Sequence, residues 1–297
     1  MFSIIGIVVV FGSILGGYLM EHGKIVILLQ PAELVIILGA AIGTVLIANP
    51  LPAVIRMAKG MLGVLSGNPY TKARYTENLK MIYDLFSLAR KSGMAKLEEE
   101  IDNPGKGAVF SKYPKFVKSH EAMHFLCDSL RTSAAGVLDP MDIDVMMETD
   151  LDVHQREGHE PITALSSMAD SLPGLGIVAA VLGVVITMGS LGGPKEEIGQ
   201  RVAAALVGTF LGILLCYGLF GPIASAMTKI HDAEEAYLGF LRSCILGLAK
   251  GLSPIMAVEL GRRAIPTHAR PTFREMETAC RGGKGAAPGQ EKQAAAA

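Results

Sequence analysis

The chain has 297 residues, half of them hydrophobic, and a formal net charge of −1. A near-neutral charge provides no basic excess for binding nucleic acid, so no nucleic-acid partner is expected. The apolar residues are clustered, whereas a soluble domain of this length would disperse them. The four cysteines lie far apart without a CxxC pair, which predicts reduced thiols and argues against a disulfide framework.

Four stretches contain no Asp, Glu, Lys, Arg or His, namely residues 1–20, 34–55, 171–194 and 202–228. Each can supply the roughly 20 residues needed to cross a hydrocarbon core about 30 Å thick. We therefore predict an all-α integral membrane protein with four transmembrane helices, at about residues 1–20, 34–52, 171–191 and 202–227. A secretory signal peptide is the alternative for the first stretch, but that stretch has neither a basic start nor a small-residue cleavage site.

The distribution of positive charge predicts the orientation of the spans. Residues 56–170 contain fourteen Lys and Arg and residues 229–297 contain ten, whereas the loops 21–33 and 192–200 contain one each. Because basic segments stay on the cytoplasmic side, both long segments and both termini are predicted to be cytoplasmic. The four spans then form two transmembrane hairpins, within residues 1–55 and within residues 171–228.

The segments outside the membrane have helical patterns. Two helical runs, near residues 115–137 and 141–157, follow an amphipathic one. We therefore predict a helical cytoplasmic domain over residues 56–170, inserted between the hairpins, and a second helical cytoplasmic segment over residues 229–282. Residues 283–297 are rich in Gly, Gln and Ala, which is typical of a disordered tail.

Two prolines mark the third and fourth spans. Asp170 or Ser171 is predicted to cap the third helix, with Pro173 in its first turn, where a missing N–H costs little. Pro222 lies inside the fourth span and cannot donate to the carbonyl oxygen of Gly218, which predicts an opened or kinked helix. An opened carbonyl in lipid needs another partner or a wet cavity, so Pro222 marks either a pathway or a plain structural kink.

Small residues recur at helical spacing in two of the spans, as Gly12 and Gly16 in the first and as Ala204, Gly208 and Gly212 in the fourth. Such faces let helices approach closely in lipid, so they predict tight packing within the bundle and association with further helices.

The third and fourth predicted spans carry no ionisable residue. A proton path through a membrane normally needs an ionisable relay. If the chain moves protons, the sequence therefore predicts that the carboxylate belongs to another chain.

The sequence "HEAMH" matches the H-E-x-x-H pattern of zinc metalloproteases. On a helix, His120 and His124 would share one face, with Glu121 nearby as a base. No third ligand is evident in the sequence, and polar residues on a solvated helix face are the simpler interpretation. We predict no metal, no cofactor and no enzymatic activity, and a membrane zinc protease remains the remote alternative.

Three stretches of the chain closely resemble the MotA family of flagellar motor stator proteins, which belongs to the MotA/TolQ/ExbB proton channel superfamily. These stretches are "QPAELVIILGAAIG" (30–43), "DSLPGLGIVAAVLGVV" (170–185) and "VGTFLGILLCYGLFGP" (207–222). "LARKSGMAKLEEEIDNP" (88–104) is similar to the rotor-facing segment of the family, and "AVELGRRAI" and "RPTFREME" are similar to its C-terminal part. The resemblance extends in collinear order over about residues 1–282.

The resemblance implies a ring of subunits, a pentamer, around two copies of the partner MotB, in the bacterial inner membrane and its lipid. The transmembrane Asp of MotB carries the ion, and MotB anchors the complex to peptidoglycan. Proton flow then turns the ring against the rotor protein FliG, which drives flagellar rotation, motility and chemotaxis. The resemblance places the ion path and its conformational coupling at Pro173, Ala180, Thr209 and Pro222. It places rotor contacts at Arg90, Glu98 and Asp150.

The resemblance also bears on the ion and on the rival functions. Sodium-driven relatives carry Thr at the positions of Ala180 and Thr209, and this chain lacks the first hydroxyl, which predicts proton use. An energy transducer of the ExbB or TolQ type is the closest alternative, but it usually has three spans. The additional hairpin at residues 1–50 and the 88–104 segment favour the MotA family. A passive membrane scaffold is the third possibility.

Overall fold

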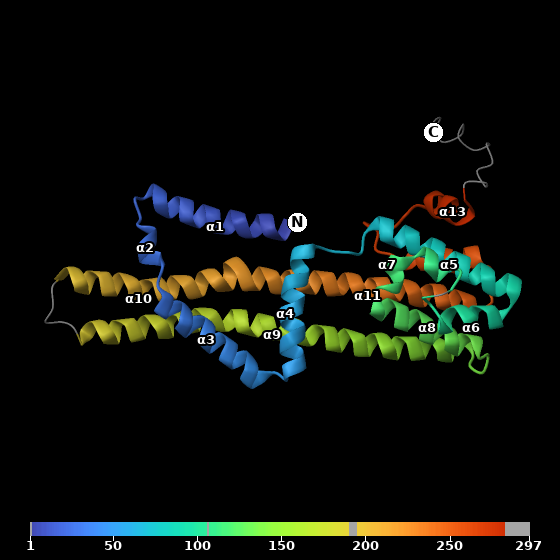
Figure 1. The fold of residues 1–297 in the computed structure, drawn as a ribbon, viewed down its shortest axis with the longest axis horizontal. Helices are drawn as coiled ribbons and strands as arrows, with labels where there is room; N and C mark the ends of the chain where they lie inside the picture. The colour runs from blue at the N-terminus through green and yellow to red at the C-terminus, as the bar shows by residue number, and fades with distance from the viewer. Residues whose placement is uncertain (1, 106, 190–194, 283–297) are drawn as a thin grey trace, which may run out of the picture. The chain divides into compact units, whose positions relative to one another are not determined.

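The computed structural model describes residues 2–105, 107–189 and 195–282 (Figure 1). The predicted tail, residues 283–297, lies outside the described residues. The chain divides into two compact units, of which unit 1 comprises Met1–Asn68 and Arg156–His231, and unit 2 comprises Pro69–Gln155 and Asp232–Ala297. The described residues form helices and no β-strand, which confirms the predicted all-α class.

Unit 1 contains the apolar helices. Its complete helices are α1 (Phe2–Met20), α2 (Ile25–Leu28), α3 (Pro31–Ala48), α4 (Leu51–Ser66) and α10 (Lys195–Leu215). It also holds part of α9 (Pro140–Met188), part of α11 (Gly221–Ala249) and the π-helical segment η2 (Cys216–Phe220) between α10 and α11. Four described stretches are long and apolar enough to cross a membrane, namely Ser3–Met20, Ile25–Ala48, Pro140–Met188 and Ile198–Ala249. Each predicted span overlaps one of these stretches, but the second predicted span, residues 34–52, runs past the end of α3 at Ala48 and into α4.

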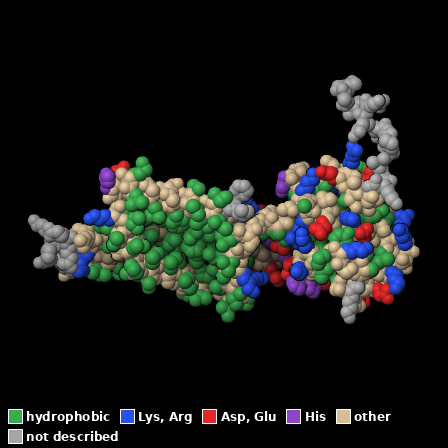
Figure 2. Space-filling view, turned by 45° about the horizontal axis from the view of Figure 1, so that its top comes forward, with side chains coloured by type: hydrophobic (Ala, Val, Ile, Leu, Met, Phe, Trp, Pro, Cys, Tyr) green, Lys and Arg blue, Asp and Glu red, His purple; other side chains and the backbone are tan. Residues whose placement is uncertain are grey.

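The surface of unit 1 is suited to lipid. Hydrophobic side chains cover its visible face as a nearly continuous area, whereas charged side chains are scattered over unit 2 (Figure 2). On α9, Val181 and Val185 are 55% and 62% exposed within the chain. An apolar surface this extensive would be unstable in water, because soluble proteins rarely expose contiguous apolar patches above a few hundred Å². The chain is therefore embedded in a membrane.

The start of the third span differs from the prediction. No helix begins at Ser171, because α9 runs without interruption from Pro140 to Met188 and passes through Pro173. The hydroxyl of Ser171 caps nothing and donates within the helix to the carbonyl oxygen of Met168, at 2.7 Å. A proline removes one backbone hydrogen bond, whereas burial of residues such as Leu172 against neighbouring helices stabilises the helix on both sides of it.

Unit 2 has a large aromatic and aliphatic core. Its complete helices are α5 (Lys72–Ser92), α6 (Met94–Asp102), η1 (Phe110–Lys112), α7 (Pro114–Val117), α8 (His120–Ala134), α12 (Pro254–Ala264) and α13 (Phe273–Arg281). The rings of Tyr75, Tyr237 and Phe240 lie 5.5–5.6 Å apart between centroids. The amide of Asn78 donates to the buried hydroxyl of Tyr237 at 2.6 Å, which ties α5 to α11.

The cysteines are free and buried. Burial raises the pKa of the Cys127 thiol and that of the Cys280 thiol to about 12. Neutral thiols at these positions are poor nucleophiles and poor metal ligands, because both roles require the thiolate. The free cysteines agree with the reduced thiols that the sequence predicts.

Candidate ion path between α9 and α10

Helices α9 and α10 run alongside each other (Figure 1), and the glycines between them show that their backbones are in contact. A Cβ atom added to Gly212 would lie 2.5 Å from the carbonyl oxygen of Leu172 and 3.0 Å from the Cα of Gly176. A Cβ on Gly176 would lie 2.8 Å from the carbonyl oxygen of Gly208. Only glycine fits at these positions, so the small-residue face predicted on α10 is confirmed for Gly208 and Gly212. Ala205, rather than Ala204, continues this contact, because it is the residue that meets Gly183.

Two predicted path residues lie at the same height along the contact between α9 and α10. Ala180 and Thr209 are both half-buried, on α9 and on α10 respectively. A Cβ on Gly208, the residue before Thr209, would lie 3.3 Å from the backbone nitrogen of Ala180. Pro173 is half-buried, two turns of α9 before Ala180. The structure thus places Ala180 and Thr209 at the α9–α10 contact, and Pro173 follows Leu172, whose carbonyl oxygen faces Gly212.

The helix is irregular next to Pro222, as predicted. The five residues of η2 form a π-helical turn that ends at Phe220, and Pro222 itself is exposed in the first turn of α11. Proline cannot donate to the carbonyl oxygen of Gly218, which lies inside η2, so the regular ladder of hydrogen bonds is interrupted there. Such π-bulges frequently occur at functional sites.

One carboxyl group at this crossing was missed by the sequence prediction. Glu33 is in the first turn of α3 and is 7% exposed. A Cβ on Gly208 would lie 2.7 Å from its Oε2 atom, so the carboxyl group reaches into the α9–α10 contact. The sequence signal was a single Glu directly before an apolar run. The second span was predicted from charge-free residues alone. It therefore begins at residue 34 and leaves Glu33 outside.

The histidines of "HEAMH" do not form a site. His120, Glu121 and His124 are exposed on α8, with the two imidazole centroids 6.5 Å apart. In the described part of the chain, no third His, Cys, Asp or Glu comes close enough to complete a metal-binding group with them.

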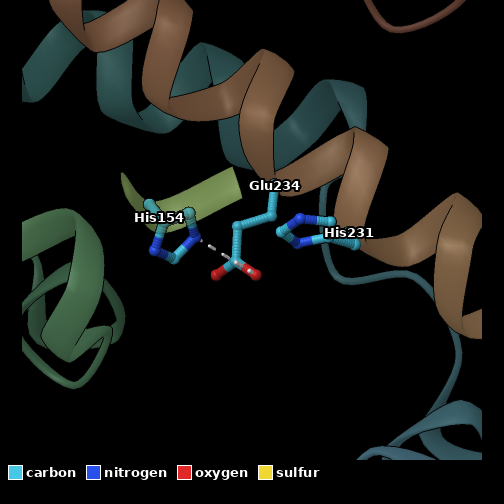
Figure 3. A group of neighbouring side chains, drawn as sticks. All are labelled: His154, His231 and Glu234. Atoms are coloured by element: carbon cyan, nitrogen blue, oxygen red, sulfur yellow. Dashed lines mark ion pairs between the residues drawn. The ribbon is translucent and has the colours of Figure 1, made fainter. Parts of the chain in front are cut away.

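A different histidine has a specific partner in unit 2, where the Nε2 atom of His154 lies 3.9 Å from Oε2 of Glu234 (Figure 3). His231, also drawn in Figure 3, lies one turn before Glu234 on α11.

The three predicted rotor residues are exposed on unit 2. Arg90 is in the last turn of α5, Glu98 is on α6, and Gly93 joins the two helices with a φ of 87°. Asp150 is on α9, beside a shallow pocket that Met146 and Met147 also line. Arg90 and Glu98 are on the consecutive helices α5 and α6, and Asp150 is on a different helix of the same unit.

Comparison with known proteins identifies the family. Residues 4–93 match the family described as "Motility protein A N-terminal", and residues 118–238 match the "MotA/TolQ/ExbB proton channel family". The chain is 37% identical to "Motility protein A" of Escherichia coli K12 over 277 residues, which cover 93% of this chain and 94% of that protein. The chain belongs to the motility protein A family. It is also 32% identical to "Chemotaxis protein LafT" of Vibrio parahaemolyticus, over 92% of this chain and 96% of that protein.

Solved structures of stator complexes share the fold of this motility protein A family member. The structure of MotAB of C. jejuni matches with a TM-score of 0.73 at 18% identity, over 89% of this chain and 95% of that chain. The flagellar MotAB stator complex of Bacillus subtilis matches with a TM-score of 0.68 at 23% identity, over 86% and 92%. The match of the N-terminal family to residues 4–93 favours motility protein A over the ExbB and TolQ branch.

Proposed function

We propose that this chain is a subunit of the flagellar motor stator, which conducts protons together with a MotB-type partner and converts their flow into rotation. One observation carries this proposal: α9 and α10 pack through glycine at the level of Ala180 and Thr209, in a chain of the motility protein A family. A charge that crosses about 100 mV releases about 2.3 kcal/mol, several times the thermal energy. The role is ion transport and force generation, without catalysis of a reaction.

The partner supplies a carboxylate that α9 and α10 themselves do not provide at Ala180 and Thr209. Neither Ala180 nor Thr209 can carry a proton as a charge, so we assign the ion-carrying carboxylate to a transmembrane Asp of the MotB-type partner. Resemblance to MotAB complexes supports this partner. Two observations support a ring of copies, which we propose to be a pentamer in lipid. The apolar face of unit 1 is exposed, and a Cβ added to Gly12 or Gly16 would meet no atom within 4 Å.

We place the complex in the bacterial inner membrane with both termini in the cytoplasm. The support is the positive charge of the two long polar segments, since segments rich in Lys and Arg stay on the cytoplasmic side. In this orientation unit 2 faces the cytoplasm, where the rotor protein FliG can reach it. The partner's anchorage to peptidoglycan would then keep the stator fixed in place.

The ion is expected to be the proton, because Ala180 offers a methyl group where a sodium site would need a hydroxyl oxygen. The test is the swimming speed of cells that depend on this stator. Speed should persist when sodium is replaced by potassium, and it should collapse when a protonophore is added. Speed that tracks external sodium at a constant proton gradient would contradict the assignment.

Rotor contact by Arg90 and Glu98 predicts an effect of charge reversal. Like charges brought together at an interface cost several kcal/mol, so an Arg90→Glu, Glu98→Lys double variant should swim about tenfold more slowly, or not at all. Protein level and proton flux should stay unchanged, because both residues are exposed on unit 2. Glu121→Lys, an exposed change on α8, is the control and should swim normally. Normal motility of the double variant would rule out this contact, and opposite reversals on FliG should restore motility.

A further inference from the structure

Glu33 is a buried acidic residue, and one of its carboxyl oxygens has no hydrogen-bond partner in the part of the chain that the structure describes. Glu33 follows Pro31 in the first turn of α3, within a stretch that is apolar enough to span the membrane. Only 7% of its surface is exposed. Its Oε2 atom has no hydrogen-bond partner among the described residues. A charged carboxylate in such a place is costly unless it is paired, so ionisable groups inside membranes usually mark ion pathways.

The space around this carboxyl group is made by two glycines. A Cβ on Gly208 would lie 2.7 Å from Oε2 of Glu33, and a Cβ on Gly183 would lie 3.6 Å from its Oε1. The carboxyl group therefore projects from α3 between α9 and α10. The same Cβ on Gly208 would lie 3.3 Å from the nitrogen of Ala180, which places Glu33 next to the candidate ion path.

The surroundings suit a proton rather than a metal ion. Two alanines lie beside the two glycines, because a Cβ on Gly208 would lie 3.3 Å from the Cβ of Ala179, and a Cβ on Gly183 would lie 2.9 Å from the Cβ of Ala205. None of these side chains supplies oxygen. The carbonyl oxygen of Gly183 already accepts a hydrogen bond from the hydroxyl of Thr187, at 2.8 Å. A hard cation requires about six oxygen ligands, whereas a proton requires only the carboxylate.

We propose that Glu33 is a second proton-binding site of the ion path, contributed by this chain and used in series with the partner's carboxylate. This inference rests on the proposed function. In each transfer the O–H bond of Glu33 breaks and its electron pair remains on the carboxylate. The proton binds a water molecule in the path, and that water passes a proton to the partner's carboxylate. A hydronium ion from the side of the membrane that supplies protons then protonates Glu33, which restores its neutral carboxyl group and leaves a water molecule.

Infrared difference spectroscopy tests the protonation of Glu33 directly. The sample is the full-length complex with a partner whose membrane Asp is replaced by Asn, so that the partner contributes no protonated carboxyl group. The parent chain should show a carbonyl band of a neutral carboxyl group at neutral pH, and this band should shift in D₂O. Glu33→Gln should abolish the band, whereas Glu21→Gln, an exposed control, should retain it. A spectrum without a Glu33-dependent band would overturn the proposal.

Proton flux through the complex with the unmodified partner tests the relay. A positioned proton-transfer group contributes at least about a hundredfold, so Glu33→Gln should reduce the flux by about that factor. Glu33→Asp, which keeps a carboxyl group, should recover part of it. Unchanged flux in Glu33→Gln would overturn the relay, as would equal loss in both variants, which indicates a packing role. If the parent complex itself conducts no protons, the proposed function fails, and the infrared band still decides whether Glu33 binds a proton.

Discussion

A Gly212→Val variant is expected to lose the packing of α10 against α9. The first atom of the new side chain would lie 2.5 Å from the carbonyl oxygen of Leu172 and 3.0 Å from the Cα of Gly176, and backbone atoms cannot rotate away as a side chain can. Overpacking of a tight contact costs about 1–3 kcal/mol, and a clash with backbone falls at the upper end. The melting temperature of the purified complex should therefore fall by roughly 6 °C or more.

The matched control for this change is Gly199→Val on the same helix. Gly199 is exposed, and an added Cβ there would meet no atom within 4 Å. It therefore introduces the same β-branched residue into α10 without the clash. Gly212→Ala should fall between the two. Equal melting temperatures for Gly212→Val and Gly199→Val would show that the close α9–α10 contact does not stabilise the protein.

A Pro222→Ala variant is expected to assemble and to rotate poorly. Alanine restores an N–H group that can donate to the carbonyl oxygen of Gly218, which favours a regular α-helix over the π-helical turn of η2. A hydrogen bond worth about 1 kcal/mol shifts an equilibrium about fivefold, so motor speed at a given load should fall by about that factor. The measurement is the rotation of cells tethered by one flagellum, at matched protein levels.

Pro52→Ala provides the comparison for Pro222→Ala. Pro52 is exposed in the first turn of α4, where a backbone N–H has no acceptor within the helix. Replacing it with alanine therefore adds no helical hydrogen bond, and motor speed should not change. If Pro222→Ala instead fails to assemble, the residue is structural. If Pro222→Ala rotates at the parent speed, the helix irregularity has no part in coupling ion flow to movement.

Local sequence patterns were sufficient for much of the fold. The four apolar stretches identified the spans, because a membrane-length run without charge has few alternatives. The spacing of Gly208 and Gly212 identified the face of α10 that contacts another helix, since four-residue spacing places both on one side. Pro222 indicated an irregular helix because its chemistry acts on its own backbone.

Long-range packing explains what the sequence did not predict. The burial of Glu33 depends on Gly183 and Gly208, which lie on two helices remote from it along the chain. No local pattern around Glu33 contains that information, because the sequence shows only a single Glu directly before an apolar run. The continuity of α9 through Pro173 likewise depends on contacts made by its neighbours, such as Leu172, which outweigh the weak propensity of the proline itself.

The most direct test of the account is proton flux into liposomes that contain purified protein. Three samples are compared: the chain alone, the chain with its MotB-type partner, and the complex in which the partner's membrane Asp is replaced by Asn. We predict flux only in the second sample, because a proton on Glu33 has no further acceptor within the membrane until the partner's carboxylate supplies one. Robust flux through the chain alone, or through the Asn complex, would contradict the claim that this chain forms one half of a shared proton channel.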